Sequence, residues 1–246
     1  MKLEIVAVGA QGAAVAAEEG ADRIELCSAL ELGGLTPSQG LMEAAQEAAD
    51  GRLEIHPLIR SRPGDFLYSD AEVDTMDREI RFLLRQGAQG VVLGVLTAAG
   101  DIDVQATRRL ADTALETNPD AQLTFHRAID QTPDPAAAVG QLLELGFTRV
   151  LSSGGAATVG AGIATLERMV QRAAGRLEVM AGGGLTLDDI PALHAAGLSA
   201  VHLSAKATVS TWKNRGDSFG TPGDSDPTAY MVTNRDLVRA ARAASR

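Results

Sequence analysis

The feature of this sequence that most restricts its fold is a repeated unit, in which a helical segment ends at a glycine and a short apolar run follows. Glycine just beyond a helix end adopts a left-handed backbone conformation at low cost, so it is a common stop signal. The runs that follow are rich in Val, Ile and Leu, as expected of strands covered by helices. The unit recurs after Gly20, Gly51, Gly87, Gly146, Gly175 and Gly197.

Two further runs, KLEIVAV at the start and QLTFHRAID from residue 122, complete a set of eight expected strands. Strict alternation of strands and helices predicts a parallel sheet. Eight such units within 246 residues predict an α/β fold of the closed (β/α)8 TIM-barrel type, with a doubly wound open sheet as the alternative. The expected strands are residues 2–8, 23–28, 53–60, 90–96, 122–130, 149–154, 177–183 and 200–206.

No shift in composition divides the chain, so residues 1–246 are expected to form one domain. The stretch 207–233 is rich in Gly, Pro, Ser and Asp, which predicts a long loop after the last strand. In a barrel this loop would lie on the face where sites occur, and it is either a functional lid or a plain insertion.

Charge and composition restrict the partners of the chain. A formal net charge of −10 and an aromatic content of 3% argue against a nucleic-acid partner, which favours basic surfaces and stacking side chains. No apolar run is long enough to cross a membrane and no signal peptide is recognisable, so a cytoplasmic protein without a membrane partner is expected. Cys27 is the single cysteine, so no intramolecular disulfide forms. A homodimer is expected only because it is the commonest assembly of soluble proteins.

Strand residues point alternately into the barrel and toward the helices, and the apolar positions should face the helices. Charged side chains among the inward positions must pair or shift their pKa values. Glu4, Glu54 and Glu178 come early in their strands, where Glu–His and Glu–Arg pairs would fill the bottom of the barrel. The inward set is Glu4, Val6, Glu25, Cys27, Glu54, His56, Arg60, Thr124, His126, Glu178, Met180, His202, Ser204 and Lys206. The candidate catalytic residues among them are Glu25, His56, His126 and His202, since histidine titrates near neutrality.

Two glycine-rich turns follow consecutive strands, SSGGA at 152–156 and AGGGL at 181–185. Glycines let the backbone approach an anion, and the helix starts behind them present free N–H groups, although tight turns alone would also explain them. The segment IRSRPGDFLYSD, which follows the third expected strand, contributes the guanidinium groups of Arg60 and Arg62. These two groups either hold a carboxylate or phosphate between them, or one of them pairs with Asp65. The candidate ligand-binding residues are Arg60, Arg62, Asp65, Ser152, Ser153, Gly154, Gly155, Gly183, Gly184, Ser204 and Lys206.

A metal site is the third kind of chemistry that the inward residues allow. Cys27, Met180 and the inward histidines are soft and borderline donors that suit Cu(I) or Zn(II). The sequence has no C-x-x-C and no H-E-x-x-H motif. One thiol with scattered companions predicts weak Cu(I) binding that depends on Cys27.

Several blocks of the sequence resemble the CutC family. They are GADRIELCSALELGGLTPS (20–38), IRSRPGDFLYSDAEVDTM (59–76), GVVLGVLTAAGDID (90–103), FHRAID (125–130), LSSGGAATV (151–159) and VMAGGG (179–184). The resemblance spans residues 3 to about 206, and residues 207–246 match less well. It implies a TIM barrel, a cytoplasmic location and a link to copper homeostasis, with copper bound by cysteines in some members.

This chain departs from the family pattern at two positions. Only Cys27, in the matching IELC block, is available as a copper ligand, because a second family cysteine has no counterpart. Ser61 stands where a proline is expected. Two hypotheses therefore remain open. The first is a copper homeostasis protein that binds Cu(I) through Cys27. The second is a barrel enzyme that acts on a small phosphorylated or carboxylated metabolite and affects copper only indirectly.

Overall fold

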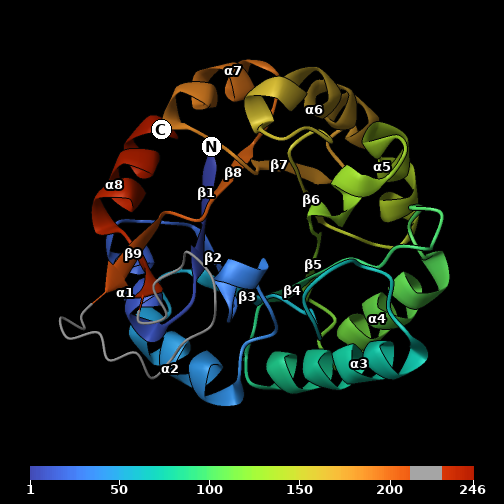
Figure 1. Cartoon of the computed structure of the whole chain (residues 1–246), viewed down its shortest axis with the longest axis horizontal. Helices are drawn as coiled ribbons and strands as arrows, with labels where there is room; N and C mark the ends of the chain where they lie inside the picture. The colour runs from blue at the N-terminus through green and yellow to red at the C-terminus, as the bar shows by residue number, and fades with distance from the viewer. Residues whose placement is uncertain (211–228) are drawn as a thin grey trace, which may run out of the picture.

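The computed structural model describes residues 1–210 and 229–246, and their strands form a (β/α)8 barrel (Figure 1). Eight parallel strands follow the order β3-β2-β1-β8-β7-β6-β5-β4. The seam between β3 and β4 is joined by a bridge between Leu58 and Val92 and by a 2.7 Å bond from the Ile59 N–H to the Val92 carbonyl. The strands are β1 (Lys2–Ala7), β2 (Arg23–Leu26), β3 (Glu54–Pro57), β4 (Gly90–Leu93), β5 (Gln122–Phe125), β6 (Arg149–Ser152), β7 (Glu178–Gly182) and β8 (Ala200–Leu203).

Helices surround the strands in an outer ring (Figure 1). They are α1 (Ala10–Glu18), α2 (Gln39–Ala49), α3 (Asp70–Arg85), α4 (Val104–Thr117), α5 (Pro135–Glu144), α6 (Val159–Ala173), α7 (Ile190–Ala195) and α8 (Arg235–Ala244), with short 3-10 turns η1 (Leu30–Leu32), η2 (Arg127–Gln131) and η3 (Leu187–Asp189). The six glycines that end the repeated units all have positive φ, between 66° and 97°, as their sequence positions predicted. None of the described helices is long and apolar enough to cross a membrane.

The strands are shorter at their carboxyl ends than the sequence predicted. His126 was expected inside a strand of residues 122–130, but it caps η2, because its ring accepts a bond from the Ala128 N–H. β8 ends at Leu203, and Ala205, with a φ of 40°, separates Ser204 from Lys206, the first residue of the next strand. The positions of Ser204 and Lys206 therefore cannot be predicted from the alternation of side chains along β8. Both residues nevertheless line the cavity at the mouth of the barrel.

The ends of the stretch expected to be a long loop form a two-stranded antiparallel ladder. Lys206–Ser210 is β9 and Ala229–Thr233 is β10, with Lys206 opposite Thr233. The middle of the stretch, 211–228, lies outside the described residues. After β10 the chain runs into α8, and the two termini meet, because the Met1 amino group donates to the Ser245 carbonyl at 2.6 Å (Figure 1).

Within the strands themselves, the predicted alternation of inward and outward side chains agrees with the structure. Leu3, Ile24 and Phe125, of the apolar parity, are fully buried in the core between strands and helices. Polar side chains of the opposite parity meet inside the ring. Small apolar groups such as Cys27 with Val6, Leu58 and Val92 fill the space between them.

The bottom of the barrel holds the predicted network of ion pairs, centred on Arg23. This guanidinium is 1% exposed and pairs with Glu4, with Glu178 at 3.4 Å and with Glu54 at 3.9 Å. Arg149 pairs with Glu178 and donates to the Thr124 hydroxyl at 3.0 Å. The sequence analysis predicted the carboxylates of this network but not Arg23 and Arg149. Each arginine is the first residue of its strand, and the pattern of inward positions was not applied to these two residues.

We predict that Arg23→Met lowers the free energy of unfolding by about 3–5 kcal/mol, because it leaves the Glu4 carboxylate buried without its cation. Denaturant unfolding measures the change. Arg239→Met is the matched control: Arg239 is 59% exposed and pairs with Glu19 on the surface, so its loss should cost less than about 1 kcal/mol. Equal losses in the two variants would contradict the importance of the interior pair.

Candidate functional site

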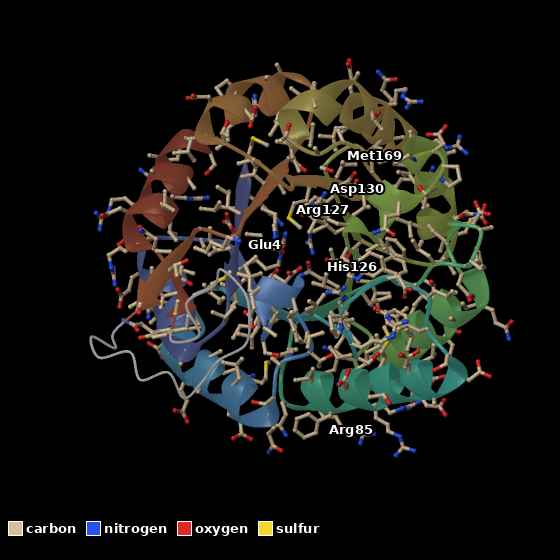
Figure 2. The ribbon with its side chains drawn as sticks, viewed as in Figure 1. Glu4, Arg85, His126, Arg127, Asp130 and Met169 are labelled. Atoms are coloured by element: carbon tan, nitrogen blue, oxygen red, sulfur yellow. The ribbon has the colours of Figure 1, made fainter. Side chains whose placement is uncertain are left out.

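A cavity of about 530 Å3 opens at the carboxyl ends of the strands, where (β/α)8 barrels place their sites. Its walls combine apolar side chains, such as Leu58, Leu151 and Leu203, with a few polar groups. Figure 2 shows that Glu4, His126 and Arg127 lie on the inner side of the ring, whereas Arg85 lies on its outer edge. The polar residues that line the cavity are Glu25, Arg60, His126, Arg127, Thr186, His202, Ser204 and Lys206.

Three adjacent strands bring Glu4, Glu25 and His202 together at the floor of the cavity. Glu4 is on β1, Glu25 on β2 and His202 on β8, and one donor atom from each lies within 4.8 Å of the others. His202 Nδ1 is 2.7 Å from Glu4 Oε1, while the second Glu4 oxygen pairs with Arg23. Glu4 thus fixes the orientation of the imidazole. Sequence reasoning had assigned Glu4 only to the bottom network.

The protonation of this group is set by burial and by neighbouring charges. Burial, opposed in part by the charge of His202, raises the pKa of Glu25 to about 7. Burial alone would lower the pKa of His202, but the hydrogen bond with Glu4 and the charge of Glu25 raise it. Burial would likewise raise the pKa of Glu4, yet Arg23 and His202 hold it well below its usual range. Near neutral pH, Glu25 is therefore able to gain or lose a proton.

His126 lines the cavity, and its Nε2 atom is buried without a hydrogen-bond partner among the described residues. Its Nδ1 accepts the Ala128 N–H at 3.2 Å, so in the neutral ring the proton resides on Nε2. Burial and the charge of Arg60 lower the pKa of His126 to about 3, so the ring stays neutral. The sequence predicted a general acid or base here. The structure instead favours a neutral donor, because the lone pair of the ring is already used.

Arg60 is a buried cation whose partners are all neutral. It donates to the carbonyls of Leu32, Gly34 and Gly64 at 3.1, 3.0 and 2.6 Å, and it lies 5.2 Å from the centre of the Phe66 ring. It makes no ion pair with any described carboxylate. The other arginine of this loop, Arg62, pairs with Asp65 at 2.8 Å and with Glu72 at the start of α3. Neither Arg62 nor Asp65 lines the cavity, so the structure does not form the predicted clamp of two guanidiniums.

The first glycine-rich turn is already filled by a carboxylate of the protein itself. Asp130 accepts bonds from the N–H groups of Ser153 and Gly155 at 3.1 Å and from the hydroxyls of Ser152 and Ser153 at 2.5 and 2.9 Å. The Gly154 N–H is also used, by the Ser152 hydroxyl at 2.8 Å. The anion that this turn was predicted to bind is therefore the side chain of Asp130, and the turn does not line the cavity.

The second glycine-rich turn does line the cavity, through Gly183 and Gly184. Arg127 lies against Gly183 so closely that a Cβ there would be 2.6 Å from the guanidinium carbon. The Arg127 Nε donates to Asp130 at 2.9 Å, which holds the side chain in place. The sequence prediction missed Arg127. Its position directly after the inward His126, at the end of a strand, was the available signal.

Two further predicted functional residues also lie away from the cavity. His56 is fully buried deeper in the barrel, with its Nε2 atom 3.5 Å from the Glu54 carboxylate, and burial lowers its pKa. Cys27 is also fully buried, in the apolar group with Val6, Leu58 and Val92. Burial raises the pKa of the Cys27 thiol well above its ordinary value, so the thiolate that binds metals is disfavoured.

The fold and the cavity define this molecule as a (β/α)8-barrel protein with a polar site at the carboxyl ends of its strands. The model of the CutC family matches residues 1–207. The chain belongs to the CutC family, as the sequence blocks indicated.

Relatives of this family align along most of the chain. A family protein CutC from Chromobacterium violaceum is 43% identical over 249 residues, covering 98% of this chain and 97% of the relative. One from Vibrio vulnificus strain YJ016 is 41% identical over 237 residues, covering 94% and 93%. The crystal structure of a Streptococcus agalactiae protein, described as a candidate copper homeostasis protein CutC, has 29% identity and a TM-score of 0.76 over 83% of this chain and 98% of that one. A Pyrococcus furiosus thiamine phosphate pyrophosphorylase, at 13% identity and a TM-score of 0.58, covers 99% of this chain and 95% of its own and shares the fold alone.

We predict that Asp130→Ala lowers the free energy of unfolding by about 2–4 kcal/mol, because several donors lose a charged acceptor. Formate should restore part of the lost melting temperature, since it can occupy the position of the missing carboxylate. Chloride at the same concentration controls for ionic strength, and wild type controls for general effects of formate. A formate response no larger than that of wild type would contradict the assignment of Asp130 as an internal anion.

We predict that Glu25→Gln stabilises the protein at pH 8 by roughly 2–3 kcal/mol and has little effect at pH 4. The pKa of Glu25 is 4.5 in the unfolded chain and is raised to about 7 in the folded protein. The wild-type protein therefore has its full free energy of unfolding below pH 4.5, and this free energy falls as the pH rises toward 7. Glutamine is uncharged at every pH, so the free energy of unfolding of the variant does not fall in this way. Denaturant unfolding with EDTA present measures the effect, and exposed Glu144→Gln is the control. A variant that is not more stable than wild type at pH 8 would contradict the raised pKa.

Proposed function

We propose that this protein is an enzyme that acts on a small phosphorylated or carboxylated metabolite in the cavity at the barrel mouth. The observation that carries the proposal is the charge of the cavity wall. Arg60, Arg127 and Lys206 line it, and within the described residues neither Arg60 nor Lys206 has a carboxylate partner. Although the chain has a net charge of −10, the described residues place no carboxylate against Arg60 or Lys206 at this concave site.

The surroundings of these cations favour an anionic ligand of small size. Much of the wall is apolar, as at Leu30, Leu58 and Leu151, so charges inside it are weakly screened. The neutral His126 ring adds an N–H donor that carries no charge. A pocket of this volume with few convergent polar groups has the form of a metabolite site. A buried guanidinium without a counter-ion gains most from a ligand that supplies one.

The floor of the cavity supplies the groups that would face the reacting part of the substrate. Of the four catalytic candidates, Glu25 and His202 line the cavity and lie beside each other. His126 takes a binding role, and His56 is a structural residue of the interior. The reaction catalysed is therefore assigned to the Glu25–His202 side of the cavity, with the ligand's anionic group at the cationic wall.

Copper homeostasis is the second candidate function, and the description of the Streptococcus agalactiae relative favours it. The residues of this chain do not fit the Cu(I) site that was expected at Cys27. Cu(I) prefers at least two soft ligands, but the Cys27 thiol is enclosed by apolar side chains. The other expected soft donor, Met180, belongs to a separate group with Leu151 and Ala200, and its sulfur is 3.4 Å from an Arg23 nitrogen. We therefore propose no role for Cys27 in copper binding.

The proposed function is tested by measuring the binding of inorganic phosphate and of a short dicarboxylate by calorimetry in EDTA. We predict that Lys206→Met weakens anion binding at least about tenfold, because a charged donor is lost. Lys2→Met is the matched control, since Lys2 lies at the opposite end of the barrel and pairs only loosely, at 4.0 Å, with Glu178. Equal affinities in these two variants, or no binding by wild type, would contradict the proposal.

A further inference from the structure

We infer that Glu25 and His202 form the ligands of a divalent transition-metal ion at the floor of the cavity, with Glu4 as the outer partner of the histidine. The inference extends the proposed function by adding a metal ion next to the bound substrate. Only the catalytic role of the ion rests on the proposed function, because binding of the metal can be tested without any substrate.

The geometry brings the donor atoms within reach of one ion. Register places Glu4 opposite His202 and Glu25 opposite Val6, two residues further along β1, so the three groups lie on neighbouring strands in successive layers of the interior. One donor atom from each of Glu4, Glu25 and His202 lies within 4.8 Å of the others. Metal–nitrogen and metal–oxygen bonds of about 2.0–2.2 Å place two ligands about 3–4 Å apart, so the proposal requires the Glu25 and His202 side chains to turn toward a common point.

Glu4 acts on the ion through His202 and is not itself a ligand. One of its oxygens accepts from His202 Nδ1 at 2.7 Å and the other pairs with Arg23, so both are occupied. With the proton on Nδ1, the lone pair of the neutral ring is on Nε2. A carboxylate bound to the far nitrogen of a histidine is the usual arrangement behind a metal-bound imidazole.

Glu25 supplies an independent sign of a missing partner. It is 8% exposed and lines the cavity, yet no described residue forms a hydrogen bond or an ion pair with its carboxylate. A buried carboxylate in that state is costly unless a proton or a cation neutralises it. A divalent ion bound at this position would neutralise it.

The donor set selects the class of ion. An imidazole nitrogen and a carboxylate oxygen suit borderline and hard divalent ions such as Zn2+ and Mn2+, and they do not suit Cu(I), which prefers sulfur. Arg23 already neutralises Glu4. A divalent ion bound to ionised Glu25 therefore keeps a net positive charge and free coordination positions. Open positions distinguish catalytic from structural metal sites, and they would accept the anionic group of the substrate.

Calorimetry with Zn2+ alone, and Mn2+ electron paramagnetic resonance, test the site in the EDTA-treated and dialysed full chain. We expect one ion per chain, and a loss of affinity of at least about 100-fold in Glu25→Gln and in His202→Gln. The matched controls are Glu144→Gln and His194→Gln, which remove an exposed carboxylate and the exposed histidine of α7 and should leave affinity unchanged. Glu4→Gln keeps both ligands and should weaken binding by about 10–100-fold.

Circular dichroism separates loss of the site from loss of the fold in each variant. Stoichiometric Zn2+ binding that persists in the double variant Glu25→Gln/His202→Gln, or that disappears in His194→Gln, would overturn the inference. So would the absence of Zn2+ and Mn2+ binding by folded wild type. If phosphate still binds to that protein in EDTA, the metal inference fails while the proposed function stands. If metal binds and no anion does, the proposed function fails instead.

Discussion

The interior of this barrel depends on one guanidinium held among three carboxylates. Arg23 reaches Glu4, Glu54 and Glu178, which belong to β1, β3 and β7. Buried charges are costly to desolvate, and they are tolerated only where oriented partners repay that cost. β1 and β3 are the neighbours of β2 in the sheet, whereas β7 is three strands away, so the Arg23–Glu178 pair is the one that spans the interior of the barrel. The hydrogen bonds of the sheet fix only the distances around it.

Glu4 connects this foundation to the site. Its two oxygens face different strands, one toward Arg23 on β2 and one toward His202 on β8. The orientation of a cavity residue is thereby set by the same side chain that completes the ion-pair network. Functional groups that are supported in this way keep their geometry without help from flexible loops. A substitution at Glu4 would therefore change both the orientation of His202 and the stability of the barrel.

The sequence predicted the barrel and the direction of its side chains because both depend on local periodicity. Glycine stops mark the repeats, and the contrast between apolar and polar positions shows which side chains point inward. The errors lie where a contact between distant residues decides the outcome. Asp130 fills a turn more than twenty residues away, and Arg62 pairs with Glu72 and so leaves the mouth. A side chain capping the backbone, as at His126, ends a strand that apolar character alone would extend.

The β9–β10 ladder ties one residue of the cationic wall, Lys206, to the C-terminal part of the chain. The family model ends at residue 207, just after Lys206, while this residue is held by pairing with Thr233 and by a 2.7 Å bond between the Asn234 N–H and the Ala205 carbonyl. The eight strands, the interior ion pairs and the Glu25–His202 floor all precede that boundary. The position of Lys206 at the mouth therefore depends on a strand far along the chain, whereas the carbonyls that hold Arg60 and the carboxylate that pairs with Arg127 belong to the first 130 residues.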